Sequence, residues 1–499
     1  MIKIIKQILA WRLEVAVFIA GAVVMIFELV GSRLLAPYLG ASLITWTSLI
    51  GVILASLAAG YYWGGKLADR RANNRWLALI LIVAGFFLLL TLALQRAVLA
   101  ALADTTWPLQ WQSAVAATVL LAPAGLCLGM VSPYTAKLKL ANLSAAGGTV
   151  GRLYALSTLG SLAGTFGAGW WLVPLFGTTK ILALLTAVLW LTAVWLFVDR
   201  PLNKSQWLCL VLGLVFWTFS YLTLTPSPAN IIDRDTAYSR VWIYDFIYRQ
   251  NSEPARLLRL DASYSSAMFL NNDDLVFDYT KFYRLAGYFN PALDKAVMIG
   301  GAGYSYPKDF LRKFPRAELT VVEIDPGVTA LARQYFRLPD DPRLIIKHED
   351  GRVWLNQTQD KYDAIFVDAF SASYAIPFQL TTKEAVEREY DSLNEDGVAL
   401  VNIVSALNSD KGRLTRSMYY TYKKVFPQVY LLPVNSPQDG AAVQNIMLVA
   451  LKAKVKPNFL SNDREEQSQL NNLWQARLEP SPILTDNWAP TDYFASQTL

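Results

Sequence analysis

Long apolar segments fill the first part of the chain. Residues 1–225 contain seven runs long enough to cross a bilayer, near 14–35, 43–64, 77–99, 112–131, 153–175, 179–198 and 206–225. The whole chain is 54% hydrophobic and only 17% charged, whereas an ordinary soluble domain is about a quarter charged. This composition excludes a disordered chain, a coiled coil and a simple soluble enzyme. It predicts a multi-span α-helical membrane domain over residues 1–225, with the lipid bilayer as its partner.

Basic residues cluster at alternate connections between these runs. They precede the first run and follow the second, fourth and sixth, as Lys3, Lys6 and Arg12, then Lys66, Arg70, Arg71 and Arg75, then Lys137, Lys139 and Arg152, then Arg200 and Lys204. The positive-inside rule therefore predicts a multi-pass protein with a cytoplasmic N-terminus. Seven spans would leave the second half outside the cell, unless a further span or a re-entrant segment near 97–111 exists. The sequence leaves the side of the second half open.

One carboxylate lies within the first apolar run. Glu28 is a functional hypothesis because an intramembrane carboxylate is costly, although pairing with Arg33 or a neighbouring helix would also explain it. Gly160, Gly164 and Ala168 recur every four residues, a spacing that favours close helix packing. Residues 64–71 resemble the short loop signature of major-facilitator transporters, but seven spans are too few for that fold.

The second half has the pattern of an α/β domain. Residues 226–290 read as a linker followed by a small β-subdomain, with strands near 240–244 and 256–260. From 291 to 499 buried strands alternate with helices, with strands near 296–300, 319–323, 344–346, 364–368, 398–403, 428–433 and 445–451. This rhythm predicts a mostly parallel, Rossmann-like sheet of the methyltransferase type, with helices on both faces.

Small and acidic residues follow four of these strands. Gly300, Gly301 and Gly303 follow the first strand of the sheet and allow close approach of a ligand to the backbone. Glu323 ends the second strand and can accept the two hydroxyls of a ribose. Asp350 and Gly351, after the third strand, and Asp368, at the end of the fourth, fall at the same edge, where ligands of such sheets bind. No phosphate-binding loop is present, so the pattern favours an adenosine-containing ligand without a pyrophosphate, such as S-adenosylmethionine.

The charge distribution argues against a nucleic-acid partner, and the scarcity of cysteine and histidine argues against a metal site. The net charge of +6 comes from the first 225 residues, which hold 15 Lys and Arg against 5 Asp and Glu, whereas the remainder holds 30 against 34. We therefore expect no nucleic-acid partner. Two cysteines and one histidine in 499 residues predict no zinc or iron site and no Ser-His-Asp triad.

The second half resembles the spermidine synthase (polyamine aminopropyltransferase) family between residues 237 and 405. The matching segments are 297–303, 321–326, 341–343, 350–352 and 362–368, whereas 28–33 and 484–490 are similar to a membrane-fused bacterial branch in particular. The resemblance implies transfer of an aminopropyl group from decarboxylated S-adenosylmethionine to an amine, with release of methylthioadenosine. It also implies a bacterial inner-membrane location, and it leaves open whether the fused chain forms a homo-oligomer as soluble relatives do.

The same resemblance assigns roles to the acidic residues. Glu323 would bind the ribose, Asp350 and Gly351 would bind the adenine, and Asp368 would deprotonate or orient the attacking amine. Apart from the resemblance, Tyr279, Tyr304 and Tyr374 are candidates to line the substrate pocket by cation–π contact or hydrogen bonding, although core or surface packing would also explain each of them. Tyr238 and Ser371 are further candidates for substrate binding.

The chain departs from the family where amines are bound. Gly303 and Ser371 stand where the family carries aspartates, and Ser239 replaces a glutamine. Fewer carboxylates bind a dication less well, and loss of the loop aspartate removes a repulsion against intact S-adenosylmethionine. Two alternatives therefore remain: an S-adenosylmethionine-dependent methyltransferase, and a non-catalytic membrane transporter or sensor that binds a nucleoside or polyamine.

Overall fold

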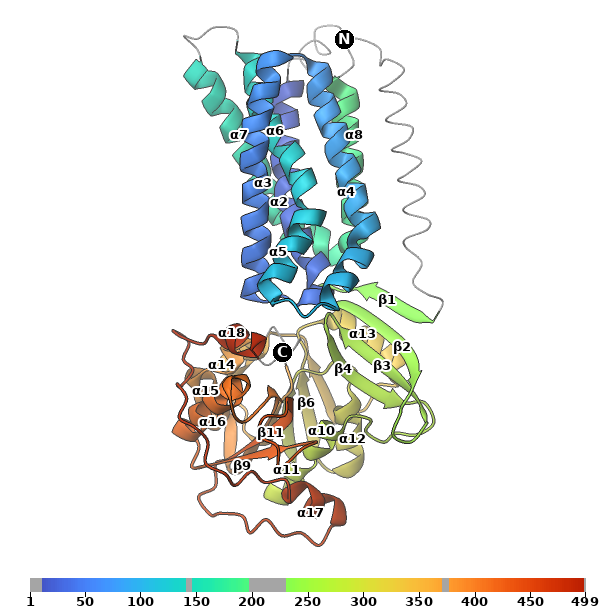
Figure 1. The fold of residues 1–499 in the computed structure, drawn as a ribbon. Helices are drawn as coiled ribbons and strands as arrows, with labels where there is room; N and C mark the ends of the chain where they lie inside the picture. Colours follow the sequence, from blue (N-terminus) through green and yellow to red (C-terminus); the bar gives the residue numbers. More distant parts are fainter. Residues whose placement is uncertain (1–10, 141–145, 197–229, 370–376, 498–499) are drawn as a thin grey trace. The chain divides into compact units, whose positions relative to one another are not determined.

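The computed structural model describes residues 11–140, 146–196, 230–369 and 377–497. The chain separates into two compact units, Met1–Ala229 and Asn230–Leu499. The first unit is helical and the second is α/β (Figure 1). The expected span near 206–225 and the linker residues that follow it lie outside the described residues.

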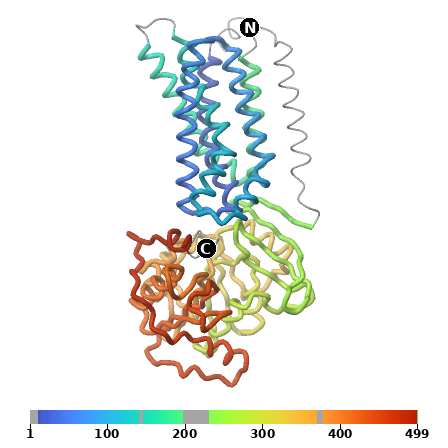
Figure 2. The backbone as a smooth tube through the Cα atoms, viewed as in Figure 1, coloured from blue at the N-terminus to red at the C-terminus, as the bar shows by residue number. Residues whose placement is uncertain are grey.

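The first unit is a bundle of long apolar helices. Its elements are α2 (Arg12–Leu39), α3 (Leu43–Arg70), α4 (Asn74–Ala103), α5 (Leu109–Leu120), α6 (Ala122–Lys139), α7 (Ala146–Gly167), the π-helix η2 (Ala168–Leu172) and α8 (Val173–Leu196). Figure 2 shows them running side by side along one direction. Helix α2 is the centre of the bundle, because it packs against α3, α4, α5, α6, α7 and α8.

Four helical stretches within the described ranges are long and apolar enough to cross a membrane, and the bent α5–α6 pair is a fifth candidate. The last of the four, Ala146–Leu196, has 51 residues. It would be roughly 75 Å long as one straight helix, more than twice the thickness of the hydrocarbon core. The backbone at Gly177 is not helical (φ 71°, ψ 163°), and the chain turns back there (Figure 1). The stretch therefore holds two segments, as expected from the runs at 153–175 and 179–198.

The run expected as one helix at 112–131 is broken. Helices α5 and α6 meet at Leu121 with a bend of 56°. Pro123 in the first turn of α6 explains the break, because it has no amide hydrogen to donate to the carbonyl of Val119 and its ring clashes with that carbonyl. A hydropathy profile does not show such a break, because the residues of α5 and of α6 are both apolar.

Glycines bring α7 onto α2, as their spacing predicts. A Cβ atom on Gly160 would lie 2.0 Å from the backbone oxygen of Phe18, and one on Gly164 would lie 2.4 Å from that of Ala22. Only glycine allows this approach, so the expectation of close packing is confirmed.

Ion pairs join the charged residues at one end of the bundle. Lys139 lies 2.7 Å from a carboxylate oxygen of Glu14, and Lys137 lies 2.8 Å from one of Asp69. Arg152 approaches the same oxygen of Glu14 at 3.9 Å. The basic residues that follow the second and fourth expected runs therefore meet at the end where α2 begins.

The second unit contains two sheets. The first has four antiparallel strands in the order β1 (Ile231–Asp235), β2 (Arg240–Ile247), β3 (Pro254–Leu260) and β4 (Ser263–Phe269). The second has seven strands in the order β10-β11-β9-β8-β5-β6-β7. These are β5 (Lys295–Ile299), β6 (Glu318–Val322), β7 (Leu344–Lys347), β8 (Tyr362–Val367), β9 (Leu393–Ser405), β10 (Gln428–Pro433) and β11 (Gln444–Leu451).

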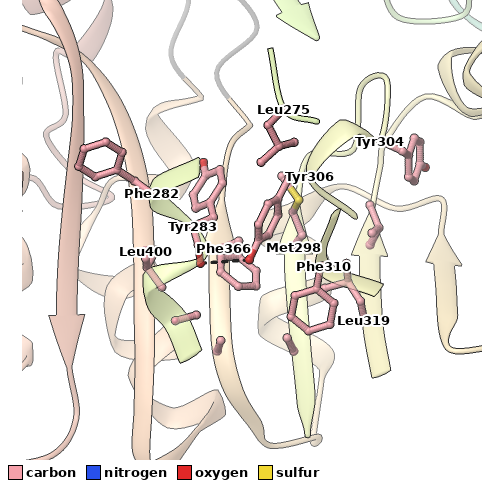
Figure 3. Packing of buried hydrophobic residues seen from close by; sticks show 14 of the residues in the cluster. Leu275, Phe282, Tyr283, Met298, Tyr304, Tyr306, Phe310, Leu319, Phe366 and Leu400 are labelled. Carbon is pink, nitrogen blue, oxygen red and sulfur yellow. Dashed lines mark hydrogen bonds between the residues drawn. The ribbon is translucent and has the colours of Figure 1, made fainter. Parts of the chain in front are cut away.

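Strands β7, β6, β5, β8 and β9 are parallel, and β10 and β11 complete the sheet in antiparallel pairing. The connecting helices are α10 (Asp278–Phe282), α11 (Leu285–Phe289), α12 (Ser305–Lys313), α13 (Pro326–Tyr335), α14 (Gly351–Gln357), α15 (Lys383–Ser392) and α16 (Arg413–Val425), followed by α17 (Arg464–Leu470) and α18 (Thr491–Ser496). Two clusters of buried apolar residues pack against the sheet. The predicted methyltransferase-type α/β fold is confirmed, and Figure 3 shows aromatic residues of the first cluster.

Candidate nucleoside and amine site

The parallel strands end together at one edge of the large sheet. The order of connections reverses between β5 and β8, because the chain goes from β5 outward to β6 and β7 and then returns to β8. Ligands of open α/β sheets bind outside the carboxyl ends of the strands at such a switch point. Gly300 follows β5 and Asp368 follows β8, so both lie at this point.

The turn after β5 lies directly against the end of β8. Gly300 has a φ of +95°, and a Cβ atom on it would lie 2.4 Å from the backbone oxygen of Asp368. The amide of Asp368 donates a 2.9 Å hydrogen bond to the carbonyl of Ile299. Only glycine can adopt this positive φ and also lie so close to the Asp368 backbone. The turn after β5 therefore lies beside the backbone of Asp368.

Glu323 holds the glycine turn from the end of β6. One carboxylate oxygen of the buried Glu323 accepts hydrogen bonds from the amides of Gly301 (2.9 Å) and Ala302 (3.0 Å). The other oxygen accepts one from the amide of Asp325 (3.0 Å) and retains capacity for a further donor. The carboxylate predicted to bind a ribose therefore already shapes the turn, and one of its oxygens can still accept a hydroxyl.

Asp350 caps helix α14. One of its carboxylate oxygens accepts hydrogen bonds from the amides of Arg352 (2.9 Å) and Val353 (3.0 Å). Gly351 is the first residue of the helix. Capping fixes the direction of the Asp350 side chain at the edge of the sheet next to β7.

Asp368 is at the centre of a polar cluster. One of its oxygens accepts a hydrogen bond from the hydroxyl of Tyr279 and the other from the side-chain amide of Asn402, each at 3.1 Å. Burial raises the pKa of Asp368 to about 6, although hydrogen bonds from Asn402, Tyr279 and Tyr283 favour the ionised form. A carboxylate with this pKa can accept a proton near neutral pH and release it again.

Sequence reasoning missed three residues of this cluster. Asn402 lies in β9, where the adjacent strand register places it next to the end of β8. The side-chain amide of Asn445, in β11, donates a 2.9 Å hydrogen bond to the side-chain oxygen of Asn402. Tyr283 is fully buried, with its hydroxyl 3.5 Å from the carbonyl of Val367. Figure 3 shows its ring next to those of Tyr306 and Phe366. A polar Asn402 inside the apolar run 398–403 was the one available signal.

Gly303 fits its neighbours too closely for a side chain. Its amide donates a 2.9 Å hydrogen bond to the hydroxyl of Ser266. A Cβ atom on Gly303 would lie 2.6 Å from Cβ of Ser266 and 3.0 Å from the ring of Phe336. The neighbours of Gly303 therefore leave no room for the aspartate that the family carries at this position.

The structure separates the predicted pocket tyrosines. Tyr279 contacts Asp368 directly. Tyr304 does not belong to this cluster, because a left-handed backbone (φ 56°) turns it into the core, where its hydroxyl bonds to Thr329 at 2.8 Å (Figure 3). Its predicted place in the pocket is thus corrected. Tyr238 is 54% exposed in the loop between β1 and β2, whereas Ser371 and Tyr374 lie outside the described residues.

The two predicted membrane residues lie in α2. Glu28 and Arg33 are both half-buried. Glu28 has no ion pair or hydrogen bond within the described part of the chain, so pairing with Arg33 does not account for it. No group of three or more metal-ligating side chains occurs in the described ranges.

The sheet order, the glycine turn and the acidic residues at the switch point define an α/β domain of the methyltransferase type with a candidate ligand-binding edge. Residues 283–458 match the family described as spermine/spermidine synthase domain. The matched residues lie within the second unit.

Several known proteins are similar to the chain. A probable polyamine aminopropyl transferase of Bifidobacterium longum is 28% identical over 41% of this chain and 45% of the relative. A polyamine aminopropyltransferase of Vibrio vulnificus is 28% identical over 43% of this chain and 67% of the relative. The chain thus spans about half and about two thirds of these two relatives.

Polyamine aminopropyltransferase 1 of Streptomyces coelicolor is 25% identical over 71% of this chain and 68% of the relative. This match covers more residues than the second unit contains, so it extends into the helical unit. Among solved structures, a probable spermidine synthase from Corynebacterium glutamicum is 21% identical, covers 55% of this chain and 95% of its own, and has a TM-score of 0.41.

Proposed function

We propose that the chain is a membrane-bound aminopropyltransferase. It transfers the aminopropyl group of decarboxylated S-adenosylmethionine to an amine and releases methylthioadenosine. The observation that carries the proposal is Asp368: a carboxylate with a pKa of about 6, at the switch point of the sheet, next to a glycine turn that is held by Glu323. The matched relatives with aminopropyltransferase names support the same reaction.

The donor would bind along the carboxyl edge. The free capacity on Glu323 would accept a ribose hydroxyl, and Asp350 would accept the amino group of the adenine. The glycine turn would lie against the nucleoside, which brings the sulfonium towards Asp368. The positive sulfonium is favoured there because the nearby side chains of Glu323 and Asp368 are carboxylates.

The transfer step needs a neutral amine. Asp368 would accept a proton from the ammonium group of the acceptor, which frees the nitrogen lone pair. The nitrogen then attacks the propyl carbon bonded to sulfur, the new C–N bond forms, and the electrons of the breaking C–S bond remain on the sulfur of methylthioadenosine. The product nitrogen is then a secondary ammonium, which keeps its charge as the product returns to water, so the proton accepted by Asp368 is the one released overall. Since neutral thioether is a good leaving group, holding the two reactants in line supplies most of the rate.

A methyltransferase is the second candidate. The neighbours of Gly303 leave no room for a side chain, so the glycine turn carries no carboxylate at this position. The turn therefore does not repel the carboxylate of intact S-adenosylmethionine. An N-terminal histidine N-methyltransferase of Emericella nidulans is 30% identical over 29% of this chain and 25% of that protein. In this reading Asp368 would accept the proton of the methylated nitrogen.

The helical unit would anchor the enzyme in the bacterial inner membrane. Helices α2, α3 and α4 each satisfy the length and hydropathy of a span, and so does the stretch from α7 to α8. The end of the bundle that carries Lys137, Lys139 and Arg152 would face the cytoplasm, by the positive-inside rule. The N-terminus would then be cytoplasmic.

The test compares two donors with purified full-length protein in detergent. Decarboxylated S-adenosylmethionine is supplied with a panel of di- and polyamines, and intact S-adenosylmethionine is supplied with the same panel. Mass spectrometry distinguishes methylthioadenosine from S-adenosylhomocysteine. Methylthioadenosine formed from the decarboxylated donor, only with an amine present, is the expected result. Formation of S-adenosylhomocysteine instead would replace the proposal with methyl transfer, and no product from either donor would reject both.

A further inference from the structure

Residues 484–490 carry a sequence motif that the proposed reaction does not use. The segment is anchored through Leu484, which is fully buried. The amide of Leu484 donates a 2.9 Å hydrogen bond to the hydroxyl of Thr421 in α16, and its carbonyl accepts one of 2.8 Å from the amide of Lys383, the first residue of α15. Asp486, two residues further along the chain, is thereby held at the start of α15.

The carboxylate of Asp486 joins the beginnings of two helices. One of its oxygens accepts a 2.6 Å hydrogen bond from the hydroxyl of Thr382, the residue that caps the N-terminus of α15. The other oxygen accepts one of 2.7 Å from a guanidinium nitrogen of Arg352, in the first turn of α14. One side chain therefore ties the start of α15 to the start of α14.

Arg352 connects this carboxylate to the residues that would bind adenine. Its backbone amide donates a 2.9 Å hydrogen bond to the carboxylate of Asp350, so two aspartates hold one arginine. Its second terminal nitrogen donates to the carbonyl of Gln379 at 2.9 Å and to the hydroxyl of Thr382 at 3.1 Å. An exposed ion pair contributes little, but the Arg352 side chain is only 15% exposed. A guanidinium bonded in this way fixes the geometry of its neighbours.

The backbone that Arg352 holds lies against Gly351. It belongs to the 3-10 helix η3 (Phe378–Leu380). A Cβ atom on Gly351 would lie 2.5 Å from a methyl carbon of Ile299, at the end of β5, and 3.6 Å from a methyl carbon of Leu380. Arg352 thus holds both the first turn of α14 and η3, two elements that meet at Gly351.

We propose that Asp486 is a positioning residue for the nucleoside site and that it sets the affinity of the donor. By holding Arg352 it keeps Asp350, Gly351 and η3 in the arrangement that receives the adenine. A site that is ordered before the ligand arrives binds more tightly, because less conformational freedom is lost on binding. The inference rests on the adenosine-binding edge of the proposed function, and it applies to aminopropyl transfer and to methyl transfer alike.

The transfer step itself should not depend on Asp486. Asp368, the proposed base, is bonded to Tyr279 and Asn402 at the end of β8. The network of Asp486 belongs instead to the beginnings of α14 and α15. Its loss is therefore expected to change KM rather than kcat.

Nucleoside affinity of the full-length protein in detergent tests the inference. Calorimetry measures the binding of methylthioadenosine and of S-adenosylhomocysteine, two adenosine thioethers. Differential scanning fluorimetry measures the unfolding temperature of the same samples. In Asp486→Asn we expect both dissociation constants to rise roughly 10-fold, since a hydrogen bond between charged groups is lost. The KM of decarboxylated S-adenosylmethionine should rise with them, whereas kcat should stay the same.

Glu479→Gln is the matched control. Glu479 also pairs the C-terminal segment with an arginine, because its carboxylate lies 3.7 Å from a nitrogen of Arg416 in α16. This variant should leave both dissociation constants unchanged. Arg352→Gln and the double variant complete a thermodynamic cycle: without Arg352, Asp486→Asn should have little further effect on affinity. Arg352→Lys cannot bond to Asp486 and Gln379 together, so it should also weaken binding, and it decides the question if Asp486→Asn does not fold.

The outcomes separate the inference from the proposed function. If Asp486→Asn binds both compounds as the wild type does, the inference is overturned and the proposed function stands, whether or not the unfolding temperature falls. An equal loss of affinity in Glu479→Gln would also overturn it, because the effect would then come from general loosening of the segment. Wild-type protein that binds neither compound would overturn the adenosine site and the inference together.

Discussion

The side-chain nitrogen of Asn402 lies 3.1 Å from a carboxylate oxygen of Asp368, and its side-chain oxygen accepts a hydrogen bond from Asn445 at 2.9 Å. The second bond fixes the orientation of the Asn402 amide, because an amide oxygen cannot donate to Asp368. Strands β9 and β11 thereby present a donor to the end of β8. Asn402 is a positioning residue for Asp368, and the ionised form of Asp368 depends on it.

Replacement of Asn402 tests this dependence. In Asn402→Leu the buried Asp368 loses one of the hydrogen bonds that favour its ionised form, so its pKa is expected to rise above about 6. A base must be ionised, so the acidic limb of the rate profile should shift to higher pH by about one unit. Turnover measured between pH 5 and 9 reports the shift. Asn445→Leu should shift the acidic limb in the same direction by less. An acidic limb at the same pH in the wild type and in both variants would refute the positioning role of Asn402.

Gly303→Asp tests the departure from the family. The added side chain meets Ser266 and Phe336, and overpacking of this kind costs about 1–3 kcal/mol. We expect a lower unfolding temperature of the intact protein by differential scanning fluorimetry. Ser266→Gly removes the closest contact, so the double variant should recover part of the loss. A stable single variant would show that the turn is more adaptable than the structure implies.

Asp309 is the centre of a buried ion network. Arg284 holds its two oxygens at 2.7 and 2.8 Å, and Arg312 adds a bond of 2.7 Å. Burial would raise the pKa of Asp309, but the two arginines lower it below its usual value. The stabilisation is therefore complete above the unfolded pKa near 3.8 and is lost as the pH falls through the lower folded pKa. Asp309→Asn should destabilise by about 3–5 kcal/mol at pH 7, measured by chemical denaturation. A loss below 1 kcal/mol would contradict this account.

Glu389 should give the opposite pH dependence. It is fully buried, and its one hydrogen bond comes from the hydroxyl of Tyr422 at 2.7 Å. Burial raises its pKa from 4.5 to about 8, so the folded protein keeps a proton that the unfolded chain has lost. Stability should therefore fall as the pH rises from 4.5 towards 8.

Glu389→Gln removes the titrating group. The stability of the α15–α16 region, measured by hydrogen exchange from pH 5 to 9, should therefore fall less steeply with pH in this variant. If stability falls equally steeply in the variant, titratable groups other than Glu389 cause the pH dependence.

The strands of the large sheet could be predicted because each is a short apolar run, and β5, β6 and β8 are followed directly by Gly300, Glu323 and Asp368. That signal, with the topological rule for parallel sheets, also predicts that Gly300 and Asp368 share an edge. The role of Asn402 depends on side-chain contacts between neighbouring strands, which no local pattern records. The direction of Tyr304 follows from a left-handed backbone angle, and the break at Leu121 from one proline within an apolar run. The ligand assignments of Glu323 and Asp350 remain predictions.

The most direct test of the central claim is to measure turnover and donor affinity of wild-type protein and Asp368→Asn on the same preparations. Methylthioadenosine release gives turnover with decarboxylated S-adenosylmethionine and the best acceptor amine, and calorimetry gives donor binding. Asp340→Asn, a change at an exposed carboxylate, is the matched control. We predict that Asp368→Asn loses about 10²–10⁴-fold in turnover and binds the donor as the wild type does. Undiminished turnover in Asp368→Asn would contradict the account.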